Sequence, residues 1–190
     1  SVNLAKVHVI EDSIEGWAEA IDALINSFFE GSAKVIFDFS MIRPKNALIA
    51  GEFLAPGSDG LKKSLELIEK LLLEKVEKND FVLTSLNCHD LICLLSDAVL
   101  SGGIRRSALI SLFDKDDELM LKCKTGNWFI DAPWRARSNN SAKLLKNSLT
   151  KVELDSYKTY IKQFGEPGIL LVDDIDMMCN PCVEIGFIPR

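Results

Sequence analysis

Short runs of β-branched and aromatic residues alternate along this chain with longer segments whose apolar residues recur every three or four positions. Runs of the first kind predict buried strands, and the second spacing predicts amphipathic helices. Strands that alternate with helices are typical of α/β folds with mostly parallel strands. We therefore expect an α/β fold in which the strands at 34–42, 105–113, 134–141 and 168–172 belong to one sheet.

The helical pattern is clear in several segments. The first has apolar residues at helical spacing from Ile14 to Phe28, and Asp12 with Glu15 is a plausible capping box before it. A shorter helix is expected to follow Asp114, which would cap its start. The remaining helices are predicted at 61–72, 91–99 and 151–163.

The composition is that of an ordinary globular protein, with 47% hydrophobic and 26% charged residues in 190. A net charge of −6 argues against a nonspecific nucleic-acid binder, which would show a basic face. No apolar run approaches the roughly 18 residues that cross a bilayer, and the first residues lack the apolar core of a signal peptide. With no repeat or linker in the sequence, we expect a single domain over 1–190.

The cysteine content indicates a reducing environment. Five cysteines are an odd number in a chain of this size, so free thiols and a cytoplasmic location are expected. The two histidines, His8 and His89, lie far apart in sequence, and we expect no metal site.

The stretch "MMCNPCVEIGFIPR" at the end of the sequence carries more functional groups than an ordinary loop. Cys182 has Asn180 two residues before it and Glu184 two residues after it. In an extended loop, residues two apart point to the same side, so the three side chains would face one pocket. An ordinary structural loop remains the alternative.

Cys179 and Cys182 also form a C-x-x-C pair. A thioredoxin-type redox pair would need this motif at the start of a helix, and a zinc site would need a second ligand pair. The spacing of Cys88 and Cys93 does not supply that pair.

Two further segments combine glycine with polar or basic residues. "LSGGIRRSALISLF" allows a sharp turn beside two arginines, which bind phosphates and bases well. "RSNNSA" places two amides and two hydroxyls at the end of a predicted strand. In isolation, the ordinary interpretation is favoured for each: a helix C-cap followed by a surface turn for the first segment, and a polar turn for the second.

Taken together, these segments resemble one family, the catalytic subunits of ribonucleotide reductases, and above all the adenosylcobalamin-dependent (class II) type. "CNPCVEI" is similar to the family's finger-loop motif, usually written N-P-C-G-E, although Val183 stands in place of the glycine. "DAVLSGGIRRSALISLFDKDDELMLKCKTGNW" with "PWRARSNNS" is similar to the long class II signature. "IRPKNALIAGEFLAPGSDGL" resembles the first specificity loop, and "GEPGI" resembles a turn before a barrel strand.

The resemblance implies a ten-stranded α/β barrel with the cysteine-bearing finger loop at its centre. Cys182 would become a thiyl radical that takes the 3′ hydrogen of the ribose. Glu184 would act as the base on the 3′ hydroxyl, and Asn180 would hydrogen-bond the sugar. The initiating radical would come from homolysis of the cobalt–carbon bond of adenosylcobalamin.

The resemblance also implies partners and nucleotide-binding loops. The partners would be a ribonucleotide substrate, a deoxynucleotide effector that acts allosterically, and a thioredoxin-like reductant, but neither a membrane nor nucleic acid. The loop residues implied to lie near the substrate or effector are Arg43, Gly51, Gly57, Gly102, Gly103, Arg105, Arg106, Ser107, Asn139 and Asn140.

The family's pair of redox cysteines is not recognisable here, so the chain is expected to be a partial barrel completed by a companion chain or segments. Three alternatives remain open. The first is a class I type fed by a separate metal-containing subunit, the second a noncatalytic chain that completes a partner's barrel, and the third a C-x-x-C thiol protein. The sequence leaves open whether diphosphates or triphosphates are reduced.

Overall fold

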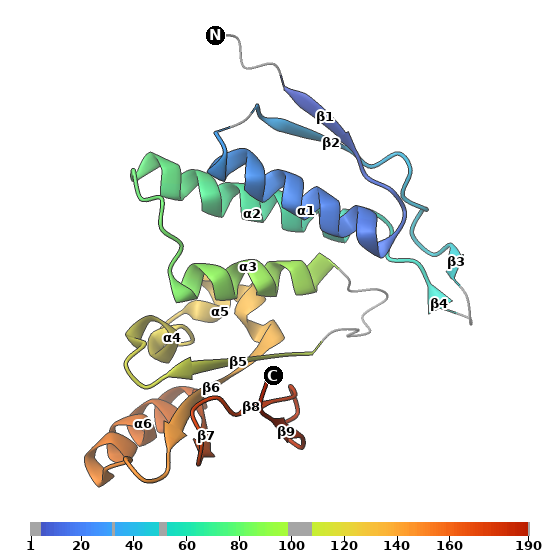
Figure 1. Cartoon of the computed structure of the whole chain (residues 1–190). Helices are drawn as coiled ribbons and strands as arrows, with labels where there is room; N and C mark the ends of the chain where they lie inside the picture. Colours follow the sequence, from blue (N-terminus) through green and yellow to red (C-terminus); the bar gives the residue numbers. More distant parts are fainter. Residues whose placement is uncertain (1–4, 32, 50–52, 99–107, 190) are drawn as a thin grey trace. The chain divides into compact units, whose positions relative to one another are not determined.

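The computed structural model describes residues 5–31, 33–49, 53–98 and 108–189, and the chain divides into two compact units (Figure 1). The first unit comprises Ser1–Val82 and Leu94–Ser107, and the second comprises Leu83–Cys93 and Ala108–Arg190. The boundary falls within helix α3 (Ser85–Ala98). The single domain expected from the sequence stays a prediction.

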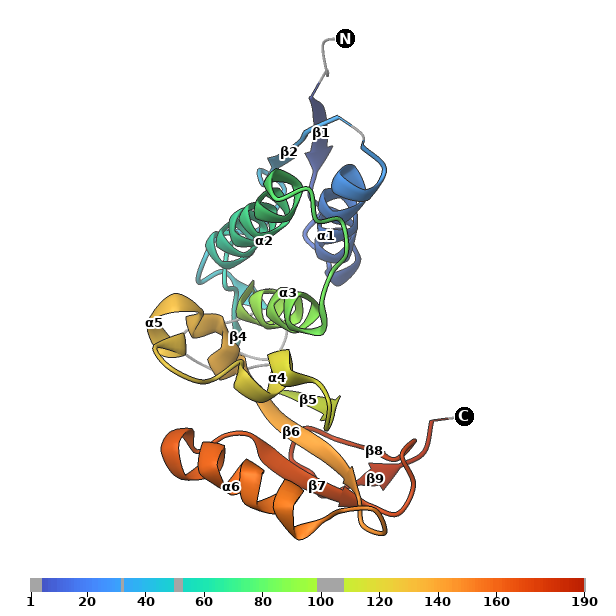
Figure 2. The same ribbon diagram turned by 90° about the vertical axis from the view of Figure 1, so that its left-hand side faces the viewer.

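The first unit packs two helices beside a two-stranded parallel sheet. Strands β1 (Lys6–Val9) and β2 (Val35–Asp38) are paired along their length, and α1 (Ile14–Phe29) connects them. Helix α2 (Asp59–Glu77) lies beside α1, as both ribbon views show (Figures 1 and 2). The predicted helices at 14–28 and 61–72 are therefore confirmed.

The first helix has a different cap from the one predicted. The hydroxyl of Ser13 accepts a hydrogen bond from the backbone N–H of Gly16 at 3.0 Å. Asp12 instead forms an ion pair with Arg43, which accounts for its absence from the cap. The apolar interior of this unit is formed by Ile10, Ala20, Leu24, Leu61, Leu65, Ile68, Leu72, Leu94 and Ala98.

The loop between β2 and α2 contains a short antiparallel hairpin that the sequence did not predict. It pairs β3 (Leu48–Ile49) with β4 (Phe53–Leu54).

The second unit is built on a three-stranded parallel sheet in the order β5–β6–β7. Strand β5 (Leu109–Asp114) pairs with β6 (Ser138–Leu145), and β6 pairs with β7 (Gly168–Val172). Helix α6 (Lys151–Phe164) connects β6 to β7 and begins with a capping box of Thr150 and Glu153. The predicted helix at 151–163 and the strands at 105–113 and 168–172 are confirmed over the described residues.

Shorter elements complete the second unit. Helices α4 (Glu118–Lys122), α5 (Trp128–Asp131) and the 3-10 helix η1 (Pro133–Arg137) lie between β5 and β6. Helix α4 is capped by Asp117, three residues later than the predicted Asp114, because Asp114 is the last residue of β5. An antiparallel hairpin of β8 (Met178–Cys179) and β9 (Gly186–Phe187) follows β7.

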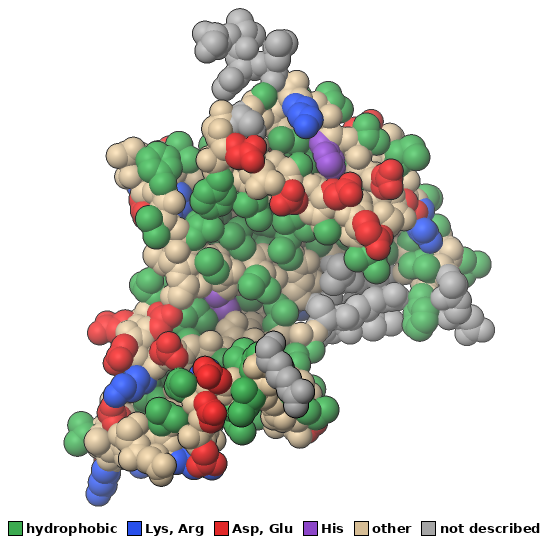
Figure 3. Space-filling view, viewed as in Figure 1, with side chains coloured by type: hydrophobic (Ala, Val, Ile, Leu, Met, Phe, Trp, Pro, Cys, Tyr) green, Lys and Arg blue, Asp and Glu red, His purple; other side chains and the backbone are tan. Residues whose placement is uncertain are grey.

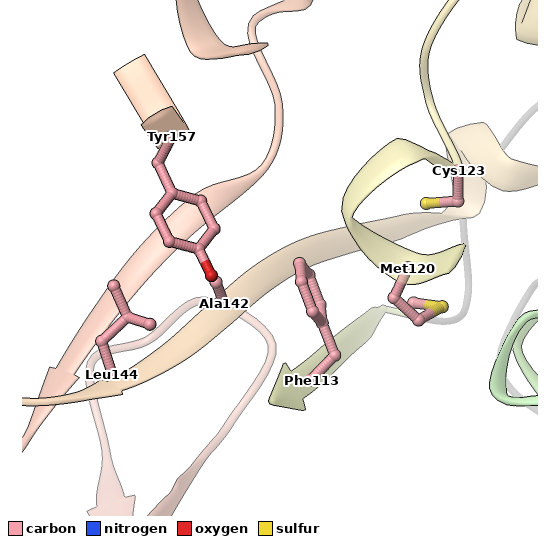
Figure 4. Close-up of a cluster of buried hydrophobic side chains, with 6 residues drawn as sticks. All are labelled: Phe113, Met120, Cys123, Ala142, Leu144 and Tyr157. Atoms are coloured by element: carbon pink, nitrogen blue, oxygen red, sulfur yellow. The ribbon is translucent and has the colours of Figure 1, made fainter. Parts of the chain in front are cut away.

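An apolar cluster holds the sheet and its helices together (Figure 4). Tyr157 of α6 lies toward Ala142 and Leu144 of β6 in this view. The other members come from β5 and from the region of α4, and the buried cluster comprises Phe113, Met120, Cys123, Ala142, Leu144 and Tyr157. The sequence-distant segments of this unit are thus joined by ordinary hydrophobic burial.

Two expectations about the strands were wrong. Strand β2, predicted to share a sheet with the other three strands, pairs with β1 in a separate sheet. The segment predicted as a strand at 134–141 begins as the 3-10 helix η1, and β6 starts only at Ser138. Pro133 occupies the first position of η1, where the fixed φ of proline suits a helical turn.

Strand β6 alternates strictly between a buried and a more exposed face. Its buried face consists of Ser138, Asn140, Ala142 and Leu144. The first two of these side chains are polar and the last two are apolar, so polar groups enter the interior where β6 begins. Buried polar groups need hydrogen-bonding partners, and neighbouring elements supply them here.

An ion pair braces this polar region. Arg135 donates two hydrogen bonds to the Asp90 carboxylate, at 2.7 and 2.6 Å, and a third to the carbonyl of Cys123 at 2.7 Å. Burial would raise the pKa of Asp90, but hydrogen bonds from Arg135 and His89 outweigh it and hold the pKa at about 2. Since that pKa is depressed, the pair stabilises the fold above pH 3.8, and its contribution is lost as the pH falls toward 2.

No helix among the described residues is long and apolar enough to cross a membrane. On the face drawn in Figure 3, acidic side chains are more widespread than basic ones, in keeping with the net charge of −6.

We predict that Asp90→Asn lowers the free energy of unfolding by about 3 kcal/mol at pH 7, because it leaves a largely buried guanidinium without its counter-charge. The side chain of Arg135 is only 16% exposed. Urea unfolding measures the effect. The control is Asp155→Asn, which breaks the solvent-exposed pair with Lys158 and should cost less than about 0.5 kcal/mol. Equal losses in the two variants would contradict the prediction.

Candidate functional site

The closing motif forms a tight turn between β8 and β9. Asn180 takes part in three hydrogen bonds of this turn, one as donor and two as acceptor. Its N–H donates to the carbonyl of Ile185 at 3.1 Å, and its own carbonyl accepts from the N–H of Val183 at 2.9 Å. Its side-chain oxygen accepts from the N–H of Ile185 at 2.9 Å. Asn180 therefore fixes the shape of the segment that carries Cys182.

The turn requires one residue in a left-handed conformation, and that residue is Val183. Its φ is +67°, an angle that L residues with a branched Cβ rarely adopt. Glycine adopts it without a steric penalty, and short hairpins often place glycine there. A glycine at this position, as in the motif that the sequence resembles, would adopt this angle without the steric cost.

Cys182 lies in this turn, next to the left-handed residue. Cys182 and Glu184 are exposed, and Asn180 is half-buried. Residues 180–185 form a turn, so the expectation of an extended loop here was wrong. Spacing by two therefore does not by itself place the three side chains on one side. The shielding that the resemblance implies for Cys182 is not found within the described residues.

The other cysteine of the C-x-x-C motif is in a different environment. Cys179 is buried in β8, and burial raises the pKa of its thiol. Because β8 is a strand that leads into a hairpin, the motif lacks the helix start that a thioredoxin-type pair requires.

Asn139 connects the sheet to this turn. It is the second residue of β6 and lies on the more exposed face of that strand. Its side-chain amide donates a hydrogen bond to the carbonyl of Pro181 at 3.1 Å. Two residues 42 positions apart in sequence are joined in this way, and Pro181 directly precedes Cys182.

Asn140 points the opposite way, into the interior of the second unit, where it is 2% exposed. Its amide nitrogen donates to the sulfur of Cys123 at 2.9 Å, and its oxygen accepts from Nε2 of His89 at 3.1 Å. His89 also lies 3.7 Å from the sulfur of Cys93. Burial raises the pKa of the Cys123 thiol. The described residues contain no group of three or more His, Cys, Asp or Glu side chains arranged to hold a metal.

Two of the predicted loop residues in the first unit lie around one pocket. Arg43 and Gly57 both line a largely apolar pocket of about 560 Å³ beside α1. Gly57 has a φ of +73°, and a Cβ there would lie 2.9 Å from the backbone nitrogen of Lys45. The glycine is therefore required by the backbone at this point.

The remaining predicted loop residues lie outside the described residues: Gly51, Gly102, Gly103, Arg105, Arg106 and Ser107. The nucleotide-binding roles of all the loop residues stay predictions.

Comparison with known proteins supports the resemblance. No family model matches the chain. It is 31% identical over 176 residues to a probable adenosylcobalamin-dependent ribonucleoside-triphosphate reductase of Dictyostelium discoideum, covering 89% of this chain and 22% of that protein. It is 32% identical over 170 residues to the adenosylcobalamin-dependent ribonucleoside-triphosphate reductase of Lacticaseibacillus paracasei, covering 85% and 21%.

A third relative is the enzyme of the same name from Levilactobacillus brevis, 33% identical over 203 aligned residues, with 93% of this chain and 26% of that protein covered. The resemblance predicted from the motifs is confirmed: the chain is a homologue of one segment of adenosylcobalamin-dependent ribonucleotide reductases. It spans about a fifth to a quarter of the length of these relatives.

The polar groups that hold β6 in place were not predicted from the sequence. Besides His89 and Cys123, they include Lys124, which is buried and donates to the carbonyl of Ser138 at 2.6 Å and to Glu166 at 2.7 Å. A signal was available. In "SNNSAKLL" the apolar Ala142 and Leu144 occupy every second position together with Ser138 and Asn140. Alternate residues of a strand share one face, so all four lie on the same, buried face.

We predict that Val183→Gly stabilises the hairpin by up to about 1 kcal/mol, because it removes the steric cost of a Cβ on a left-handed backbone. Hydrogen exchange of the Val183 and Ile185 amides, or of the glycine amide in the variant, measures the change. The control is Val183→Ala, which removes the same methyl groups but keeps a Cβ and should give little gain. A similar gain in both variants would show that the left-handed conformation is not the cause.

Proposed function

We propose that this chain carries the radical-bearing loop of an adenosylcobalamin-dependent ribonucleotide reductase and takes part in reducing ribonucleotides to deoxyribonucleotides. The observation that carries the proposal is the turn at 180–185, which holds Cys182 between Asn180 and Glu184 in a defined backbone conformation. The relatives are named ribonucleoside-triphosphate reductases, which favours ribonucleoside triphosphates as the substrates.

Each residue of the turn has a distinct role in this proposal. Cys182, as a thiyl radical, takes the 3′ hydrogen of the ribose, so that an S–H bond forms as the C3′–H bond breaks. Glu184 accepts the proton of the 3′ hydroxyl, for which a nearby carboxylate is suited. The oxygen of the Asn180 side chain is bonded within the turn, so we assign its amide nitrogen to the sugar.

The described residues fit the cofactor in one respect. The Cys182 thiol is exposed, so a cofactor brought against the turn would meet the sulfur directly. When bound, adenosylcobalamin supplies the initiating radical by homolysis of its cobalt–carbon bond. The task of this chain is then to hold the Cys182 sulfur in one place and direction.

The rest of the catalytic apparatus belongs to the same proposal. The strands of the second unit would form part of a ten-stranded barrel, with the hairpin as its finger loop. Companion segments would complete the barrel and cover Cys182. A deoxynucleotide effector would act through the loops that carry Arg43, Gly57 and residues 102–107. A thioredoxin-like protein would supply the electrons, and we place the reaction in the cytoplasm.

A second candidate is a noncatalytic chain that completes the barrel of a partner. The observation in its favour is that Cys182 is exposed within the described residues, whereas a radical site is shielded from water. A class I reductase is a weaker candidate, since the three relatives described are named as adenosylcobalamin-dependent. Substitution of Cys182 separates the catalytic role from the noncatalytic one.

We predict that Cys182→Ser abolishes nucleotide reduction, because a serine hydroxyl holds its hydrogen too strongly to relay a radical. The assay measures deoxyribonucleotide formation with adenosylcobalamin, a ribonucleoside triphosphate and the companion segments supplied by coexpression. The matched control is Cys88→Ser, which removes another exposed thiol and should keep nearly full activity. Substantial product from Cys182→Ser would refute the radical role.

We predict that Glu184→Gln keeps nucleotide binding but lowers the rate by a factor on the order of 10²–10⁴, because the amide cannot accept the proton. Turnover at saturating substrate and equilibrium binding of the nucleotide are measured on the same preparation. The control is Glu118→Gln, which removes an exposed carboxylate of α4 and should change neither value. A variant with the normal rate would exclude Glu184 as the base.

A further inference from the structure

The two adjacent asparagines of β6 face opposite sides of the strand and make different kinds of contact. Asn140 is bonded within the interior, to His89 and Cys123. Asn139 reaches out from the strand, and its amide donates to the carbonyl of Pro181 in the turn. One amide therefore holds the strand in its unit, and the other holds the turn to the strand.

The strand is well fixed on both sides of Asn139. On one side, the carbonyl of Ser138 accepts a hydrogen bond from the buried ammonium of Lys124 at 2.6 Å. The Ser138 hydroxyl also lies 3.2 Å from that of Ser111 on the neighbouring strand. On the other side, Asn140 is held by its two interior bonds. The backbone of Asn139, from which its side chain extends, is therefore held in place on both sides.

The Asn139 amide donates its hydrogen bond to the carbonyl oxygen of Pro181, the residue just before Cys182. The carbonyl of Pro181 lies in the same planar peptide unit as the nitrogen of Cys182. Fixing this oxygen therefore fixes the plane of the peptide that leads into Cys182. The hydrogen bond from the Val183 N–H to the Asn180 carbonyl restrains the next peptide, so rotation about the Cys182 N–Cα bond is restricted and the direction of its side chain is set. The three bonds that end on Asn180 hold the turn together, whereas the Asn139 bond attaches it to the sheet.

We propose that Asn139 is a positioning residue that sets the orientation of the Cys182 thiol by anchoring the Pro181–Cys182 peptide to β6. It acts through Pro181 and has no need to touch substrate or cofactor. Its importance for reduction rests on the function proposed above, but the anchoring itself is measurable in the chain without nucleotide or cofactor.

The test compares Asn139→Ala, Asn139→Asp and Asn139→Gln with the unaltered chain. Alanine removes the donor, aspartate replaces it with an oxygen that repels the Pro181 carbonyl, and glutamine keeps the donor on a longer side chain. Two quantities are measured: hydrogen exchange of the Val183 and Ile185 amides, and the rate of iodoacetamide labelling of Cys182 relative to Cys88, resolved by mass spectrometry.

The exposed Cys88 is an internal standard for labelling. The matched control is Ser141→Ala, on the same face of β6 two residues further along. We expect hairpin exchange about 2- to 10-fold faster in Asn139→Ala, the range for loss of one ordinary hydrogen bond, and faster still in Asn139→Asp. The ratio of Cys182 to Cys88 labelling should change in both variants, and Asn139→Gln should restore part of the difference. Ser141→Ala should leave both quantities unchanged.

Two outcomes would overturn the proposal. In the first, Asn139→Ala and Asn139→Asp leave both quantities within 2-fold of the unaltered chain. In the second, exchange rises equally in the hairpin and in β5 and β6, which would show a general loosening of the sheet. If Asn139→Asp or Asn139→Ala fails to fold, the other of these two variants decides whether Asn139 anchors the turn. An active Cys182→Ser enzyme would refute the proposed function and leave this anchoring untouched, so the two failures are distinguishable.

Discussion

The second unit depends on the alternation of side chains along β6. Because successive residues of a strand point to opposite faces, an amide at Asn140 has to enter the interior if Ala142 and Leu144 do. A buried amide left without partners would cost about 1–3 kcal/mol, which explains why both of its ends are bonded. His89 and Cys123 are thereby fixed relative to the strand. The ion pair of Arg135 with Asp90, next to His89, braces the same region.

The same alternation makes Asn139 available to the turn. Once Asn140 is inside, its neighbour must face the other way, and it is within reach of Pro181. The two consecutive asparagines at the start of β6 thus have different roles: Asn140 holds the strand in its unit, and Asn139 holds the turn to the strand. The apolar half of the strand, with Tyr157 and its neighbours in the cluster, holds the sheet to α6 by burial, and the Tyr157 hydroxyl also donates a hydrogen bond to the carbonyl of Lys115 at 3.3 Å.

Much of this arrangement follows from the sequence, and the exceptions have physical causes. Helices α1, α2 and α6 were predicted because their apolar residues recur at helical spacing over more than three turns. Strand β1 was missed because four residues carry too little periodicity. The start of β6 was misplaced because its polar residues suggested the end of a strand. The motif around Cys182 identified the candidate site, but no local pattern could reveal that Asn139, 42 residues away, contacts it.

The left-handed backbone at Val183 changes how the motif should be understood. A glycine in a sequence pattern is usually taken as a small residue that leaves room for a ligand. Here the position requires a left-handed backbone angle, which a valine adopts at an energetic cost. The chain adopts such angles elsewhere at Asn46 and Asn79, and asparagine tolerates them better than most residues. A different residue at 183 would then change how firmly the turn is held, without altering the side chains of Asn180, Cys182 and Glu184.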